Sequence, residues 1–131
     1  MSTRSNIVVT DGNTFLIFYK HSDGYPKGTL PLLRSFVDDI AAGKIRSDVT
    51  QSAGWLIRNT ILTAEESKYG YGWKASHIEP ASLDCLPFDT EYLYVVNTVT
   101  KRIEYSEVNG TTKKDIQKLM IKSCQDPDYS S

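Results

Sequence analysis

Residues 15–19 restrict the fold most strongly, because the run Phe-Leu-Ile-Phe-Tyr is apolar at every position. A strand with one solvent-exposed face alternates apolar and polar residues. A continuous apolar run therefore predicts a central strand that is covered on both faces. The β-branched run of residues 7–10 precedes it, and Asp11-Gly12-Asn13 separates the two runs. Asp-Gly between apolar runs is a strong signal for a tight hairpin. The sequence therefore predicts a first hairpin, with strands near 5–10 and 14–20.

A second hairpin is predicted in the last third of the chain. Two strands, near 91–97 and 102–108, are rich in tyrosine, valine and isoleucine and are joined by a connection of hairpin length. A shorter strand is expected near residues 77–78. The chain therefore supplies two strand pairs for one antiparallel sheet.

Three helices are predicted from apolar residues at helical spacing. The first covers about 30–42, with Thr29 as its N-cap and Gly43 as its stop signal. The second begins near Asp48, and the third covers about 111–123. Two hairpins and three helices predict an α+β fold with two layers: an antiparallel sheet of two hairpins with helices packed on one face.

Length and composition favour one water-soluble domain. The 131 residues fit a single domain, with a short flexible polar tail from about residue 126. Fifteen basic residues and sixteen acidic ones leave a net charge of −1, so no global field attracts nucleic acid or a membrane surface. The chain has no apolar run long enough to span a bilayer, and its first residues do not resemble a signal peptide. We therefore expect a cytoplasmic protein with neither a nucleic-acid nor a membrane partner.

Neither a metal nor a cofactor is predicted. Cys85 and Cys124 are far apart in sequence, so we expect free thiols. Together with His21 and His77 they could supply four zinc ligands, but structural zinc sites usually draw on closely spaced ligand pairs, which this chain lacks. The sequence also lacks a glycine-rich phosphate-binding loop, a GxSxG nucleophile elbow and an HExxH zinc-binding motif.

The loop after the second strand is the first candidate site. His21 and Asp23 stand two residues apart and could form an acid–base pair, and the helix start that follows could hold an anion. The alternative is a structural corner, in which Asp23-Gly24 forms a tight turn and Tyr25-Pro26 packs beside it. Turn chemistry accounts for every residue except His21, so we favour the corner.

Two further segments could bind a partner. Tyr69, Tyr71 and Trp73 belong to an aromatic and glycine-rich stretch suited to a protein interface, although aromatic rings also stack on bases. Lys114 and Lys118 belong to a basic stripe on the last helix, which either contacts an acidic partner or forms an ordinary solvated face. We favour the solvated face for the lysine stripe. Because the net charge is near zero, we favour a protein over a nucleic acid as the partner that these segments would bind.

The opening Met1-Ser2-Thr3-Arg4 and the segment His21-Ser22-Asp23-Gly24-Tyr25-Pro26 resemble a family of small bacteriophage proteins. Members of that family begin Met-Ser-Thr-Arg and carry a His-x-Asp-Gly-Tyr-Pro element after the second strand, and residues 89–96 are similar to their second hairpin. The resemblance implies a phage or mobile-element accessory protein made in a bacterial cytoplasm. It implies no general activity.

Two functions of different classes are compatible with these observations. The first is a protein that binds and modulates a host protein or complex, for instance an inhibitor of a bacterial defence system such as CRISPR. The second is a small enzyme or binder that acts on a nucleotide or another anionic ligand through Arg4, His21 and Asp23. We favour the first because catalytic motifs are missing, and we expect a monomer or a two-fold homodimer.

Overall fold

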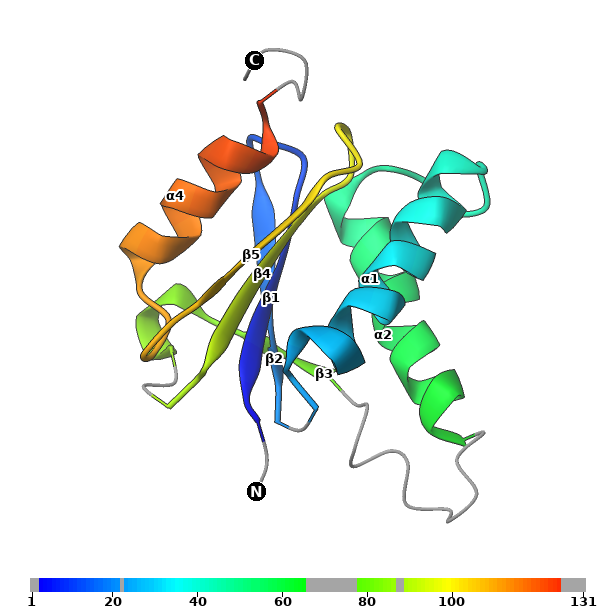
Figure 1. Cartoon of the computed structure of the whole chain (residues 1–131). Helices are drawn as coiled ribbons and strands as arrows, with labels where there is room; N and C mark the ends of the chain where they lie inside the picture. Colours follow the sequence, from blue (N-terminus) through cyan, green and yellow to red (C-terminus); the bar gives the residue numbers. More distant parts are fainter. Residues whose placement is uncertain (1–2, 22, 66–77, 87–88, 126–131) are drawn as a thin grey trace.

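The strand β1 (Ser5–Thr10) lies in the middle of the molecule, in a computed structural model that describes residues 3–21, 23–65, 78–86 and 89–125. The elements around it follow one another along the chain as Figure 1 shows. They are β2 (Phe15–Lys20), α1 (Pro26–Ala41), α2 (Val49–Glu65), β3 (Ile78–Ala81), the 3₁₀ turn η1 (Leu83–Cys85), β4 (Tyr92–Asn97), β5 (Ile103–Glu107) and α4 (Lys113–Ser123).

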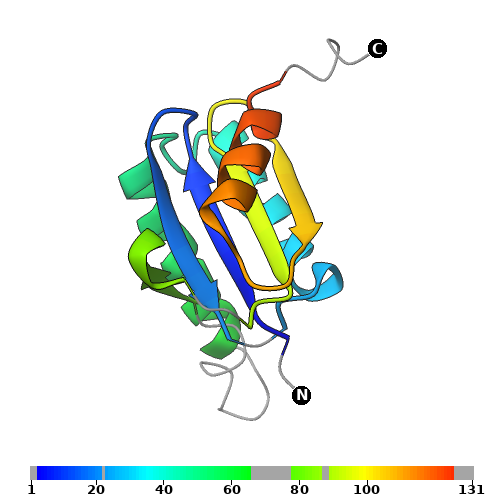
Figure 2. The same cartoon turned by 90° about the vertical axis from the view of Figure 1, so that its left-hand side faces the viewer.

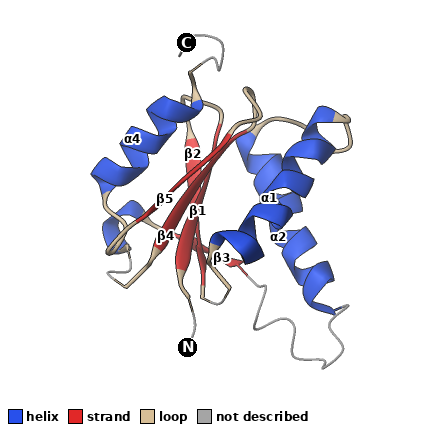
Figure 3. Ribbon diagram, in the orientation of Figure 1, coloured by secondary structure: helices blue, strands red, loops and turns tan. Residues whose placement is uncertain are grey.

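The five strands form one sheet in the order β3-β2-β1-β4-β5 (Figure 3). The first predicted hairpin is confirmed: β1 pairs antiparallel with β2, and Ser5 lies opposite Lys20. The Asp11 carboxylate closes its turn by accepting hydrogen bonds from the N–H groups of Asn13 and Thr14 at 2.9 and 2.8 Å. The second hairpin, β4 with β5, is confirmed as well.

The two hairpins meet in a way that the sequence analysis did not predict. β1 and β4 are parallel neighbours, so that Ser5 pairs with Tyr92 and Thr10 with Asn97. The sheet is therefore mixed, where an antiparallel one was predicted. The short predicted strand, β3, pairs antiparallel with β2 at one edge.

The prediction that all helices pack on one face is wrong. In Figures 1 and 2, α1 and α2 cover one face of the sheet and α4 covers the opposite face. Each face has its own buried cluster, because successive strand residues point to opposite sides. The α1/α2 cluster includes Ile7, Phe18, Leu33, Phe36 and Tyr94, and the α4 cluster includes Val8, Ile17, Leu93, Val95, Ile116 and Leu119.

One further prediction, the position at which the first helix begins, is wrong. α1 begins at Pro26 and not near residue 30, because Pro26 occupies the first turn, where its missing N–H costs nothing. Thr29 is consequently not an N-cap but a fully buried residue of the first turn. The predicted stop is correct: Gly43 follows the helix in the left-handed region with φ 79°.

Candidate functional sites

The corner after β2 is held by three hydrogen bonds to its main chain. Asp23 has a φ of 56°, and its carbonyl accepts a bond of 2.9 Å from the Thr29 hydroxyl. The N–H of Gly24 donates to the carbonyl of Thr3 at 2.9 Å, and the carbonyl of Gly24 accepts from the Tyr94 hydroxyl at 2.7 Å. These contacts tie the corner to the N-terminal segment, to α1 and to β4.

Gly24 is required at this corner by close packing. A Cβ atom there would lie 2.8 Å from Cβ and Oγ of Ser5 and 2.8 Å from the carbonyl oxygen of Thr3. Real Cβ contacts are not that short, so any side chain would push the corner away from β1. The geometry therefore favours the structural interpretation of the Asp23-Gly24 turn.

Arg4 and His21 do come together, in a chain of polar contacts at the surface. The Tyr19 hydroxyl lies 2.8 Å from His21 Nδ1, and Arg4 Nε donates to the same nitrogen at 3.4 Å. Arg4 also forms an ion pair of 3.2 Å with Asp89. The Asp23 carbonyl bonds to the Thr29 hydroxyl and not to this group. The His21–Asp23 pair considered from the sequence is thus replaced by an Arg4–His21–Tyr19 group.

That group has few features of an acid–base site. His21 is exposed, and its Nδ1 faces a guanidinium, which can only donate. Burial raises the pKa of the Tyr19 hydroxyl above its ordinary value of 10.0, so Tyr19 stays protonated and can donate to His21 at neutral pH. His21 Nδ1 thus serves as the shared contact of Arg4 and Tyr19, while the Arg4 guanidinium also pairs with Asp89.

Lys20 is a buried cation that the sequence analysis did not single out. Lys20 is only 2% exposed. It lies on the α1/α2 face of the sheet and pairs with Ser5 of β1. Burial lowers the pKa of this ammonium below 10.5, and the charge of Asp23 opposes that shift. The sequence does contain a signal for the burial of Lys20. This residue directly follows the apolar run of residues 15–19, which predicts a strand covered on both faces.

A groove runs along α4, between this helix and the β1–β2 turn. Its volume is about 520 Å³, and the opposite wall comes from η1 and the start of β2. Most of its lining is apolar, and Ile121 is 59% exposed. The lining residues are Gly12, Phe15, Leu83, Lys113, Ile116, Gln117, Met120, Ile121 and Cys124.

The lysines of α4 lie beside this groove. Lys113 is part of its wall, while Lys114 and Lys118 are exposed on the outer surface of the same helix. Asp115 is the only acidic residue of α4. The basic stripe predicted from the sequence therefore borders an open apolar surface, which the sequence pattern alone did not reveal.

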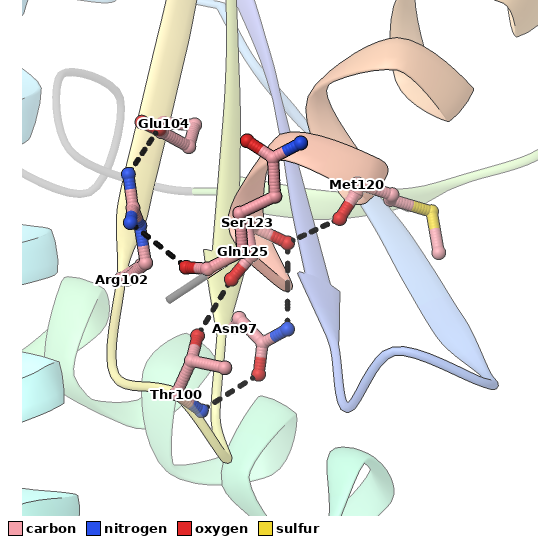
Figure 4. Close-up of polar contacts among 7 residues, drawn as sticks. All are labelled: Asn97, Thr100, Arg102, Glu104, Met120, Ser123 and Gln125. Atoms are coloured by element: carbon pink, nitrogen blue, oxygen red, sulfur yellow. Dashed lines mark hydrogen bonds and ion pairs between the residues drawn. The ribbon is translucent and has the colours of Figure 1, made fainter. Parts of the chain in front are cut away.

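The C-terminal end of α4 is fixed to the β4–β5 turn by the network in Figure 4. The Thr100 hydroxyl donates to the Ser123 carbonyl at 2.7 Å, and the Asn97 amide donates to the Ser123 hydroxyl at 3.4 Å. Arg102 donates to the Gln125 carbonyl at 2.9 Å and forms an ion pair of 2.9 Å with Glu104 (Figure 4). This network holds the helical wall of the groove in place.

Several predicted site residues lie outside the described residues. These are Tyr69, Tyr71 and Trp73 of the aromatic stretch and His77. Within residues 3–21, 23–65, 78–86 and 89–125, no cluster of three or more His, Cys, Asp or Glu could hold a metal ion. In the same part of the chain both cysteines are free thiols, and no helix is long and apolar enough to cross a membrane. The role of the aromatic stretch stays a prediction.

The chain matches no family model, no curated protein and no solved structure.

Proposed function

We propose that this chain is a protein-binding module that docks on a partner protein through the groove along α4. The observation that carries the proposal is the open apolar groove of about 520 Å³, with Lys113 in its wall and Lys114 and Lys118 exposed on the same helix. Exposed apolar surface with a polar rim is typical of protein interfaces. Lys113, Lys114 and Lys118 favour an acidic, amphipathic segment as the occupant, because its carboxylates would face the helix while its apolar side chains fill the groove.

The source of the partner is the finer part of the proposal. The resemblance of residues 1–4 and 21–26 to phage proteins supports a phage accessory protein that acts on a host protein in the bacterial cytoplasm. A small binding module without catalytic motifs suits an inhibitor of a bacterial defence complex, of the anti-CRISPR kind. The measurement is the plating efficiency of a targeted phage on a CRISPR-carrying host, with and without expression of this chain. Unchanged plating would exclude the anti-CRISPR role and leave the docking groove to its own test.

Capture of partners from a bacterial lysate tests the groove, provided that matched variants are compared. Ile121→Glu places a charge on the groove at a residue 59% exposed, and Val99→Glu makes a similar change at a residue 58% exposed in the β4–β5 turn. We expect a partner that binds the wild type and Val99→Glu and is lost with Ile121→Glu. Lys114→Glu with Lys118→Glu should weaken the same complex. Equal capture by Ile121→Glu and the wild type would contradict docking in the groove.

A second function, binding of a small anion, is favoured by one observation. Arg4 and His21 lie together at the surface, within 3.4 Å of each other. Titration of inorganic phosphate and of a nucleoside triphosphate, followed by the NMR signals of the His21 ring, tests this function. A saturable shift that disappears in Arg4→Gln and persists in Arg58→Gln would support an anion site. Signals that do not move with either anion would rule it out.

A further inference from the structure

β5 is an open edge of the sheet, since β4 is its partner among the described strands. Arg102 and Val108 bond to β4: the Arg102 carbonyl accepts from Asn97, and the Val108 N–H donates to Glu91, both at 2.9 Å. In an antiparallel pair, alternate residues turn their N–H and C=O groups to opposite sides. The groups of Ile103, Tyr105 and Glu107 therefore point away from the sheet, where another strand can bond to them.

The opposite edge of the sheet has protection that β5 lacks. β3 has only four residues, and Pro80 in its middle cannot donate a main-chain hydrogen bond. β5 has five residues and contains no proline or glycine. Of the two edges, β5 is thus the one that suits the addition of a strand.

An aromatic surface reaches the same edge. The Tyr105 ring stacks on the Tyr94 ring, with centroids 5.7 Å apart and planes at 26°, and Tyr92 lies 6.4 Å beyond Tyr94. Tyr105 is 47% exposed although it lies next to the fully buried Tyr94. An added strand would cover the open side of this ring, and cross-strand contacts of aromatic residues stabilise sheets.

The charges around β5 indicate which strand fits. The segment begins with Lys101 and Arg102 and ends with Glu104 and Glu107, so its basic half precedes its acidic half. Arg102 and Glu104 neutralise each other in an ion pair of 2.9 Å, while Lys101 and Glu107 are exposed. When such a segment pairs antiparallel with an identical one, each basic end meets the acidic end of the other copy. In the register that places Lys101 opposite Glu107, the two Glu104 residues meet at the two-fold axis, where Arg102 of the same copy neutralises each of them. The exposed charges of the edge, Lys101 and Glu107, are then complementary.

We propose that a second copy of this chain binds at β5, so that the two β5 strands pair antiparallel and join both sheets around a two-fold axis. Ile103, Tyr105 and Glu107 supply the outward main-chain groups, and Lys101 of each copy lies beside Glu107 of the second copy. Two five-residue strands bury less area than a standard interface, so we expect a weak dimer with a dissociation constant in the micromolar range or above. This inference goes beyond the proposed function and leaves the groove along α4 free in both copies.

Sedimentation and light scattering of the full chain over a wide concentration range test the dimer. The wild type should pass from monomer to dimer as its concentration rises. Tyr105→Pro removes an outward N–H without removing a bond to β4, so it should remain monomeric with its fold intact by circular dichroism. Wild-type chain that stays monomeric up to its solubility limit would overturn the proposal.

Charge exchange provides a test that does not depend on how well the proline variant folds. Lys101→Glu and Glu107→Lys should each weaken dimerisation at least about fivefold, because each creates two like-charge contacts per dimer. The double variant restores opposite charges and should recover the wild-type dissociation constant. A dimer that is unaffected by all three variants uses another surface, and that result would overturn the assignment to β5.

Discussion

The hydroxyl of Tyr94, on strand β4, donates a hydrogen bond of 2.7 Å to the main-chain carbonyl of Gly24. Tyr94 is fully buried, so water does not replace this bond when the hydroxyl is removed. Tyr94→Phe should therefore lower the free energy of unfolding by about 1–3 kcal/mol, the cost of an unsatisfied buried carbonyl. Denaturant unfolding measures it. Tyr105→Phe makes the same chemical change on a half-exposed ring and should have little effect, so equal losses would contradict this role for Tyr94.

Gly24→Ala should destabilise the protein, and Gly54→Ala should stabilise it. The new Cβ at position 24 would lie 2.8 Å from Ser5 and Thr3, and such overpacking typically costs about 1–3 kcal/mol. A Cβ at Gly54, inside α2, meets nothing within 4 Å, so alanine gains helix propensity of up to about 1 kcal/mol. Melting temperatures that shift in opposite directions are the expected result. A Gly24→Ala variant that melts at or above the wild-type temperature would show that close packing does not determine the corner.

Lys20 should make stability depend on pH below 10.5. Burial lowers the pKa of this ammonium in the folded state, so the unfolded chain binds the proton more tightly. Below the lowered pKa, the buried charge of Lys20 reduces the free energy of unfolding. Between the lowered pKa and 10.5, the free energy of unfolding rises with pH, because the folded state has lost the proton and the unfolded state still binds it. Lys20→Met removes this contribution. The difference in unfolding free energy between the wild type and Lys20→Met should move in favour of the wild type between neutral pH and that limit, and a constant difference would argue against a shifted Lys20.

Thr112→Ala should destabilise α4 by about 1 kcal/mol, as expected for loss of an N-cap. The Thr112 hydroxyl accepts from the N–H of Asp115 at 3.1 Å, and the Asp115 carboxylate accepts from the N–H of Thr112 at 3.1 Å. Lys114→Ala, on the exposed surface of the same turn, should change stability by less than about 0.5 kcal/mol. If the groove binds an acidic partner, Lys114→Ala should weaken the complex more than Thr112→Ala does, although it affects stability less.

Local sequence signals predicted the hairpins well because the physical causes are local. Asp11 and Gly12 close a turn through contacts within four residues, and the strand ranges near 5–10 and 91–97 match β1 and β4 closely. The cap at Thr112 is likewise a contact between neighbours in the sequence. In each of these places, a few adjacent residues determine the geometry.

The arrangement of the hairpins depends on contacts that no short segment contains. Antiparallel and parallel docking of β1 against β4 use the same apolar residues, so the choice is made by the whole sheet. The helix on the second face did have a signal, because Val8, Ile17 and Val95 are apolar on the side that α4 covers. The start of α1 was missed because Gly28 reads as a loop residue, whereas a Cβ at this position would lie 2.9 Å from the Asp23 carbonyl oxygen.

Among the candidate sites, too, local sequence signals predicted some features and missed others. The corner at Asp23 and Gly24 was predicted from turn chemistry, and the lysines of α4 from their spacing. The groove was not, because its walls come from the β1–β2 turn, from η1 near Leu83 and from α4 near Met120. A surface assembled from three distant segments becomes visible only when the chain is folded.

The parallel pairing of β1 with β4 has a consequence for synthesis on the ribosome. The hairpin of β1 and β2 is synthesised well before β4, which pairs with the other edge of β1. Pairing that joins distant parts of a chain is also slow to form. The nascent chain therefore leaves one main-chain edge of β1 unpaired until residue 97 has left the exit tunnel, and the Val8 and Ile17 face stays uncovered until α4 has followed. Fragments that end before β4 should depend on chaperones to remain soluble.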